Sequence, residues 1–145
     1  MFSQKAEYAL RAVVWLAEHI DDGPVGNQQI AEGTQVPVTY LAKILQELVR
    51  CELVTSRRGA GGGFKLIANP AKLTVLDVVN SVDPIKRYTG CPLKLKSHAK
   101  KRCPMHASLD DALGKLEAVL SGTSIANILN DTSRPKPMVE SRKRH

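Results

Sequence analysis

The sequence predicts a mainly α-helical protein with one small β-hairpin and a long C-terminal helix. Three features of the 145 residues support this fold class. Apolar residues recur at helical spacing through most of the chain, and a single pair of β-prone runs flanks a glycine-rich turn. The last long periodic segment carries apolar residues near the 3.5-residue repeat of paired helices. A chain of this length has room for one domain with an appended element.

Composition places the chain among folded globular proteins, because 43% of its residues are hydrophobic and 24% are charged. The sequence has no run of about eighteen apolar residues, and its polar N-terminus lacks the apolar block of a signal peptide. We therefore expect a cytoplasmic protein that does not associate with membranes. The sequence places no nucleophile beside a base and no paired carboxylates, so we do not expect an enzyme.

The N-terminal segment predicts two helices. The first covers residues 3–20, whose apolar positions fall on one face, and it ends at Asp21-Asp22-Gly23-Pro24. The second covers residues 27–32, with Asn27 as its N-terminal cap and Gly33 at its end.

A third helix predicts a helix-turn-helix unit. It starts near Pro37, which the first turn of a helix tolerates, and runs to about Cys51. The apolar residues of one face are Leu41, Ile44, Leu45 and Leu48. The second and third helices are joined by a four-residue turn that contains a glycine, as in helix-turn-helix units.

A β-hairpin follows the third helix directly. Residues 53–56 and 64–67 are β-prone, and the turn between them, Arg57-Arg58-Gly59-Ala60-Gly61-Gly62-Gly63, is rich in glycine. A hairpin in this position is a wing. Residues 1–84 are therefore predicted to form a winged helix-turn-helix DNA-binding domain.

The start of the third helix and the tip of the wing carry the candidate DNA contacts. Thr39, Tyr40 and Lys43 can reach base edges or phosphates from a recognition helix. In the wing, arginines can enter a narrow minor groove where glycines let the backbone approach DNA. The alternative is that the glycines only permit a tight hairpin. The predicted contacts are Gln28, Thr39, Tyr40, Lys43, Arg57, Arg58, Gly61 and Gly62.

The C-terminal part is predicted to contain three further helices, a loop and a tail. Residues 75–82 form a helix that Thr74 caps and Asp83-Pro84 stops. The later segments are a cysteine-containing sensor loop at 85–104 (the cysteine loop), a dimerisation helix with a short terminal helix at 105–130, and a mobile basic tail at 131–145.

The positive charge of the chain is concentrated in the cysteine loop. Lysines and arginines number 21 against 14 aspartates and glutamates, which gives a net charge of +7. Residues 86–102 hold seven basic residues and no acid, so the remainder of the chain is balanced. Such a block favours a nucleic-acid partner or is a solvated charged surface.

The motifs named above resemble the Rrf2 family of bacterial winged-helix regulators. The resemblance rests on Tyr40-Leu41-Ala42-Lys43-Ile44-Leu45, on the segment from Leu53 through the wing to Phe64, and on the opening Gln4-Lys5-Ala6-Glu7-Tyr8-Ala9-Leu10. It continues through Val79-Asn80-Ser81-Val82-Asp83 and covers about the first 130 residues. The resemblance implies a homodimeric transcription regulator, a repressor, that crosses its long helices and binds a palindromic operator in double-stranded DNA.

The resemblance also implies an iron–sulfur cofactor. Cluster-sensing members of the family carry three cysteines at six-residue steps in this loop, whereas here Ser97 occupies the middle place. A labile 2Fe–2S cluster would be held by Cys91, Cys103, His106 and Glu7 of the partner subunit, with His98 as the alternative ligand. DNA binding would then respond to redox state, nitric oxide or iron–sulfur status.

Three other interpretations of the cysteine loop stay open. Cys91, His98, Cys103 and His106 form a plausible tetrahedral zinc set, although the spacing of the two cysteines is not that of a zinc finger. The two cysteines can instead form a reversible disulfide or act as sensor thiols. The loop can also have lost its cofactor and bind nothing.

Overall fold

Helices make up most of the structure, and two strands form a small sheet. The computed structural model describes residues 2–140. Its elements are α1 (Gln4–Glu18), η1 (Ile20–Asp22), α2 (Asn27–Thr34), α3 (Val38–Arg50), β1 (Val54–Arg57), β2 (Gly63–Leu66), α4 (Val75–Val82), η2 (Lys96–His98), α5 (Pro104–Ser121) and α6 (Ile125–Asn130). The predicted fold class, mainly helical with one antiparallel hairpin, is confirmed.

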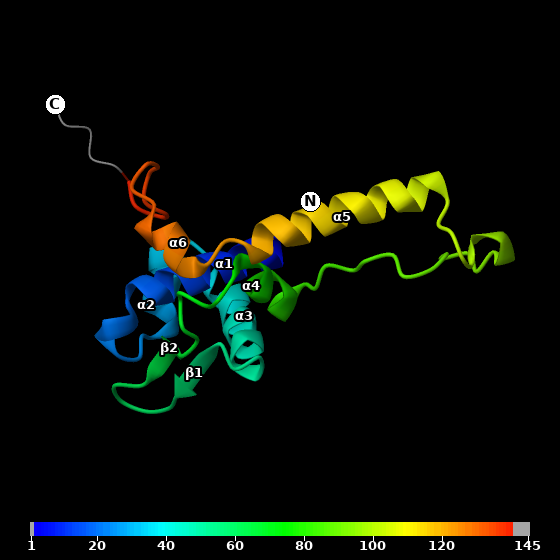
Figure 1. Ribbon diagram of the computed structural model, residues 1–145. Coiled ribbons are helices and arrows are strands. Elements are labelled where there is room, and N and C mark those ends of the chain that lie inside the picture. The colour runs from blue at the N-terminus through cyan, green and yellow to red at the C-terminus, as the bar shows by residue number, and fades with distance from the viewer. Residues whose placement is uncertain (1, 141–145) are drawn as a thin grey trace.

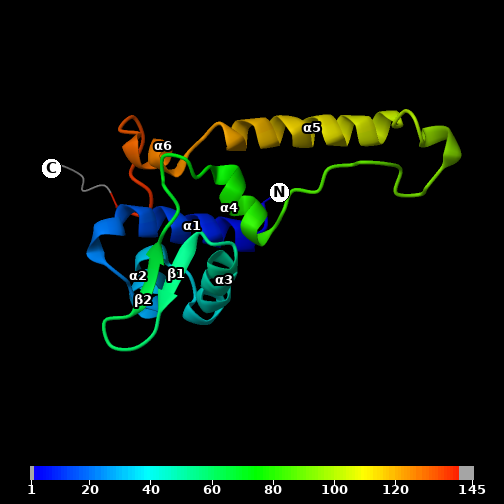
Figure 2. The ribbon, with the colours of Figure 1, turned by 60° about the horizontal axis from the view of Figure 1, so that its bottom comes forward.

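The molecule consists of a head and an arm (Figure 1). The head comprises residues 2–83 and 122–140, and the arm comprises residues 84–121. After α4 the chain leaves the head and extends outward to the point where α5 begins. It then returns to the head as α5 (Figure 2). Since α5 has 18 residues, it is about 27 Å long. Within residues 2–140, no helix combines the length and apolar content needed to cross a membrane.

The core of the head is built around α1. Its small residues Ala6, Ala9 and Ala12 are almost completely buried, which lets α2, α3, α4 and α6 pack closely against it. The largest fully buried side chains include Leu16, Ile30, Leu41, Ile44, Leu45, Leu48, Leu66 and Ile125. Burying each of these side chains stabilises the fold by about 1.5–3 kcal/mol. The predicted apolar face of α3 is therefore confirmed as a core face.

The hairpin is fixed to the head by an isolated β-bridge. Val54 pairs with Leu66 and Arg57 with Gly63 in the antiparallel register. Val25 forms a bridge to Phe64, with N–H···O distances of 2.9 and 2.8 Å. Gly63 allows this close approach, because a Cβ there would lie 2.3 Å from the Val25 carbonyl oxygen. The wing is thus held against the segment that precedes α2.

The helix ends confirm one predicted cap and correct another. Thr74 and Asp77 form a capping box, with N–H···O distances of 3.1 and 3.0 Å. The prediction that Asn27 caps α2 is wrong, since Asn27 is the first helical residue and Gly26 is the cap. The glycine backbone takes the extended conformation of a cap without supplying a side-chain acceptor.

Gly33 does not end α2, contrary to the prediction. The helix continues through Thr34, and Gln35 takes the left-handed conformation with φ 56°. Gly33 is instead required by packing, because a Cβ there would lie 2.1 Å from the indole nitrogen of Trp15. This glycine therefore fixes the distance between α1 and α2.

The predicted tail lies partly within the structure. Residues 131–140 belong to the head, where the Lys136 ammonium pairs with Glu18 of α1. Residues 141–145 lie outside the described residues. The mobility of this segment stays a prediction.

Candidate DNA-binding surface and cysteine loop

The exposed start of α3 carries two of the predicted contact residues in free positions. Thr39 and Lys43 are exposed, whereas Tyr40 is half-buried because its ring packs edge-on against Tyr8, at a centroid distance of 5.5 Å. Gln28 is exposed on α2, and its amide donates to Glu32 at 3.3 Å. The exposed side of the helix-turn-helix unit therefore presents hydrogen-bond donors together with part of the Tyr40 ring.

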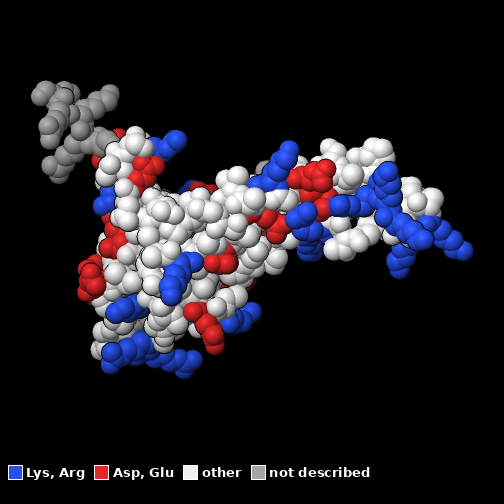
Figure 3. All heavy atoms as spheres, in the orientation of Figure 1, with Lys and Arg blue, Asp and Glu red and all other residues white. Residues whose placement is uncertain are grey.

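The wing presents both of its arginines. Arg57 and Arg58 are exposed at the tip of the hairpin, and basic side chains gather at this end of the head (Figure 3). Gly61 has φ 72°, which favours glycine, and Gly62 donates its N–H to the Gly59 carbonyl at 3.0 Å. A Cβ on Gly62 would lie 2.2 Å from the Arg57 carbonyl oxygen. These two glycines thus shape the tip that carries the arginines.

The hairpin and α3 lie on the side of the head that faces away from α5 (Figures 1 and 2). A recognition helix and a wing on one face are the arrangement with which winged helices contact a major and a minor groove. Since the arm leaves the head on the other side, it does not cover this face.

The cysteine loop brings four of the predicted ligands to one hollow. Cys91, His98, Cys103 and His106 line it together with Gly90 and Arg102. Both cysteines are free and half-buried. The Cys103 sulfur lies 3.4 Å from Nδ1 of His106, and the His106 ring lies 5.0 Å from that of Tyr88. The three-residue spacing of Cys103 and His106 at the start of α5 therefore brings their side chains together.

His98 differs from its neighbours in the hollow. Its Nδ1 is buried and has no hydrogen-bond partner among the described residues. The adjacent Ser97, which stands at the place of the family's middle cysteine, is exposed. Beside the position of the family's middle cysteine, the side chain that lines the hollow is therefore the imidazole of His98.

Glu7 lies in the head, outside the hollow of its own chain. It is exposed on α1 and accepts from Nε of Arg11 at 2.9 Å. Arg11 also donates to the Thr34 carbonyl at 3.2 Å and lies over the Tyr8 ring at 5.1 Å. Within its own chain, Glu7 therefore forms a surface ion pair.

The hollow is not a preformed metal centre. Among residues 2–140, no three histidine, cysteine, aspartate or glutamate side chains are placed closely enough to hold one metal ion. The four donors line the same hollow but are too far apart to bind one ion. Binding a metal would require them to move toward a common point. The donor chemistry, two thiols and two imidazoles, fits both a 2Fe–2S cluster and zinc.

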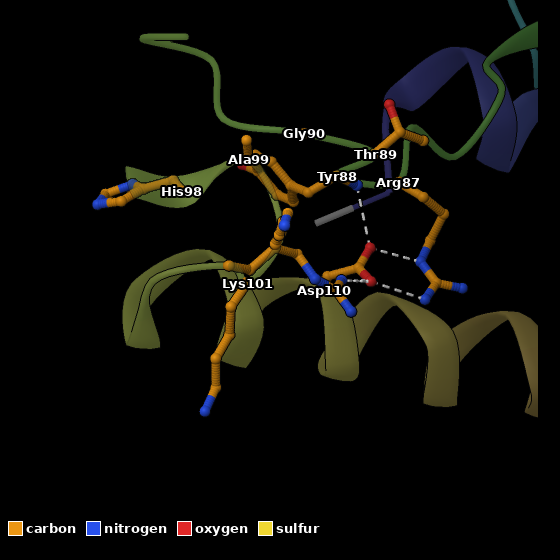
Figure 4. Close-up of a pocket in the computed structure, with 10 residues that line it drawn as sticks. Arg87, Tyr88, Thr89, Gly90, His98, Ala99, Lys101 and Asp110 are labelled. Carbon is orange, nitrogen blue, oxygen red and sulfur yellow. Dashed lines mark hydrogen bonds and ion pairs between the residues drawn. The ribbon is translucent and has the colours of Figure 1, made fainter. Parts of the chain in front are cut away.

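Asp110 is a functional residue that the sequence predictions missed. It is buried in α5 and accepts from Nε and Nη2 of Arg87 at 2.7 and 2.9 Å, and from the Tyr88 N–H at 3.0 Å (Figure 4). Arg102 also donates to it, and Arg87 reaches Glu117 at 2.6 Å. Both flanks of the cysteine loop are therefore tied to one carboxylate.

These donors control the ionisation of Asp110. The Arg87 guanidinium, with the Tyr88 N–H and Arg102, holds the pKa of Asp110 well below its usual range, although burial acts in the opposite direction. The same contact, with Glu117, raises the pKa of Arg87. The network is therefore fully charged near neutral pH.

Part of one face of α5 is exposed among residues 2–140. Met105, Leu109 and Val119 are 61%, 45% and 66% exposed. The full stripe is Met105, Leu109, Ala112, Leu116 and Val119, in which Leu116 is half-buried beside Phe2 and Val79. Its alternating spacing of four and three residues is the repeat with which two helices pair.

Sequence comparisons identify the family. The chain matches a family model described as Rrf2, iron-dependent transcriptional regulator, over residues 2–131. It is 30% identical over 129 residues to the HTH-type transcriptional regulator IscR of Aliivibrio salmonicida, covering 89% of this chain and 77% of that protein. IscR of Photorhabdus laumondii is also 30% identical over 129 residues, with 89% and 79% covered.

Structural comparisons agree with this assignment. T. potens IscR superposes with a TM-score of 0.73 at 26% identity, covering 97% of this chain and 93% of that chain. CymR, described as the global cysteine regulator of B. subtilis, shares the fold with a TM-score of 0.72 at 24% identity, covering 88% and 95%. The relatives are regulators rather than enzymes, as predicted. The chain belongs to the Rrf2 family of DNA-binding transcription regulators.

Proposed function

We propose that the chain is a homodimeric repressor whose binding to a palindromic operator is controlled by a labile 2Fe–2S cluster in the cysteine loop. The observation that carries this proposal is the hollow in which two free thiols and two imidazoles meet. The description of the family as iron-dependent and the likeness to IscR support it.

We assign recognition of the operator sequence to α3 and the wing, which are both exposed on the head. Thr39 and Lys43 contact base edges and phosphates in the major groove, and the exposed edge of Tyr40 contacts a phosphate or a thymine methyl group. Arg57 and Arg58 serve the minor groove. The supporting contacts come from Gln28 and from the backbone at Gly61 and Gly62. Two half-sites about one DNA turn apart match a two-fold symmetric dimer.

Dimerisation is assigned to the apolar stripe of α5. A surface that exposes Met105, Leu109 and Val119 on an extended arm gains hydrophobic stabilisation when a second copy covers it. The 3.5-residue repeat of the stripe fits a helix of the same sequence. The long helices of two copies would then cross, as the family resemblance implies.

The ligand set proposed for the cluster starts from Cys91, Cys103 and His106. Glu7 of the partner subunit or His98 completes it. A bound 2Fe–2S cluster supplies a one-electron redox centre that nitric oxide or oxidation can disrupt. Because Asp110 ties the loop to α5, a change in the loop reaches the helix that sets the spacing of the two recognition helices.

Anaerobic purification tests this function. We expect about two irons and two sulfides per chain, with visible absorption bands. Operator fragments can be obtained by selecting random DNA for binding to the protein. The cluster-loaded protein and the chelator-treated protein should bind these fragments with affinities that differ about tenfold. The variant with Cys91→Ala and Cys103→Ala should be colourless and should not respond to the chelator. A wild-type protein that remains without iron after reconstitution with iron and sulfide would contradict the proposal.

A thiol switch or a zinc site is the second candidate for the same fold. It is favoured by the free state of Cys91 and Cys103 and by their shared hollow. In that case the colourless, metal-free protein should change its operator affinity with diamide and recover it with dithiothreitol. Zinc would instead bind at one ion per chain and abolish the response to diamide.

A further inference from the structure

We propose that one chain supplies all four ligands of its metal site, Cys91, His98, Cys103 and His106, so that His98 takes the place otherwise assigned to Glu7 of the partner subunit. This inference rests on the proposed function of the cysteine loop and specifies its ligands. It follows from three features of the loop.

The first feature is the buried nitrogen of His98. A polar nitrogen that is removed from water without a hydrogen-bond partner is destabilising, and such atoms are rare in folded proteins. Nδ1 of His98 is in this state, and the hollow beside it also receives Cys91 and Cys103. A metal ion bound by these thiolates gives the nitrogen the partner that the described residues do not provide.

The second feature is the way the loop is held. Arg87 and Tyr88 before Cys91, and Arg102 before Cys103, all bind Asp110. Between the cysteines, η2 places His98 by a turn in which its N–H donates to the Leu95 carbonyl at 3.1 Å. The same chain therefore keeps both thiols and the imidazole at one hollow before any metal binds.

The third feature is that Glu7 already has a charged partner. Its carboxylate is bound by Arg11, which is itself fixed by the Thr34 carbonyl and the Tyr8 ring. Moving Glu7 to a metal would leave Arg11 without its counter-charge. His98 requires no such exchange, since it breaks no hydrogen bond of the described structure by binding a metal.

The set of two thiolates and two imidazoles has a chemical consequence. Clusters with two histidine ligands have higher reduction potentials than clusters with four thiolates. The proposed site is therefore reduced more readily than an all-cysteine site. Because all its ligands lie in residues 91–106, cluster binding does not require the dimer.

Nitrogen-sensitive pulsed EPR of the dithionite-reduced, reconstituted protein tests the inference. The wild-type protein should show couplings from two histidine nitrogens. His98→Ala should lose one of them and should release iron to a chelator at least about tenfold faster. Glu7→Ala should keep both couplings and the wild-type rate. Lys96→Ala, an exposed change in the same short helix, is the matched control and should also keep both.

A rescue variant keeps the result independent of folding. Ser97→Cys combined with His98→Ala restores a thiolate near the lost imidazole, and it should recover the slow iron release with one nitrogen coupling. Two unchanged couplings in His98→Ala, together with cluster loss in Glu7→Ala, would overturn the inference and leave the proposed function intact. A wild-type chain that takes up no iron and sulfide would instead refute the proposed function.

Discussion

At the scale of single residues, Asp110 decides where the cysteine loop lies. One buried carboxylate receives Arg87, the Tyr88 N–H and Arg102, so it joins the two flanks of the loop to α5. Asp110 is buried, whereas the Arg87 and Arg102 side chains are 38% and 39% exposed, so water can still solvate both guanidinium groups when the carboxylate is lost. Loss of Asp110 would therefore release the loop from α5 rather than unfold the head.

We predict that Asp110→Asn releases the loop while the head stays folded. The amide keeps the volume of the side chain but loses the charge that holds two guanidinium groups. Hydrogen exchange of residues 86–103 should become faster, and iron release from the reconstituted protein should accelerate. Asp111→Asn changes an exposed neighbour and should have neither effect.

The same residue predicts the response to acid. The folded pKa of Asp110 lies below the unfolded value of about 3.9, so its contribution is complete above that pH. The contribution is lost as the pH falls through the folded pKa. Loop protection should therefore persist at pH 4 in the wild-type protein and in Asp111→Asn, and it should be missing at every pH in Asp110→Asn. Loss of protection above pH 5 would contradict this assignment.

Residue-scale prediction from sequence succeeds for local pairs and fails for distant ones. Cys103 and His106 are three residues apart on a helix, so their approach follows from helical geometry. Arg87 and Asp110 are separated by 23 positions in the chain, and no periodicity links them. Their contact depends on the path of the whole arm, which the sequence pattern does not contain.

At the scale of elements, the wing depends on the backbone of its tip. Gly62 lies against the Arg57 carbonyl so closely that a methyl group cannot fit without a shift of the turn. The position of Arg57 and Arg58, the two arginines proposed to contact DNA, therefore depends on the close packing at Gly62.

We predict that Gly62→Ala moves this tip and weakens operator binding about tenfold, with a loss of about 1–3 kcal/mol of stability from overpacking. Fluorescence anisotropy with operator DNA and thermal unfolding measure the two effects. Gly122→Ala is the matched control, because its Cβ would make only ordinary contact with Ala118. An operator affinity equal to that of the control would show that the tip does not contact DNA.

The sequence predicts helices and strands well where residue type and spacing indicate the same structure. It predicts the ends of these elements less well. The capping box at Thr74 and the core face of α3 follow from residue type and spacing alone. The ends of α2 do not, because packing decides them. Gly33 is needed beneath Trp15, so the helix passes through this glycine and ends at Thr34, with Gln35 as its C-terminal cap.

At the scale of the whole molecule, the arm separates the cysteine loop from the face that carries α3 and the wing. Five of the seven basic residues of the loop belong to its distal part, residues 94–102, and basic side chains gather at the end of the arm away from the wing (Figure 3). The net charge of +7 is therefore mostly not part of the DNA footprint. In the proposed dimer, a signal from the loop would travel along α5, where a change in helix pairing would alter the spacing of the two recognition helices.

We predict that Leu109→Glu converts a dimer to a monomer. Leu109 is 45% exposed on the outer stripe of α5, so the head should keep its thermal stability while a charge in the paired seam disfavours association. Ala118→Glu, which places the same charge on an exposed position outside the stripe, should remain dimeric. Sedimentation measures the mass of each variant, and operator binding should fall at least about a hundredfold in the monomer because only one half-site is held. If Leu109→Glu remained a dimer with full operator affinity, the stripe would not be the dimer interface.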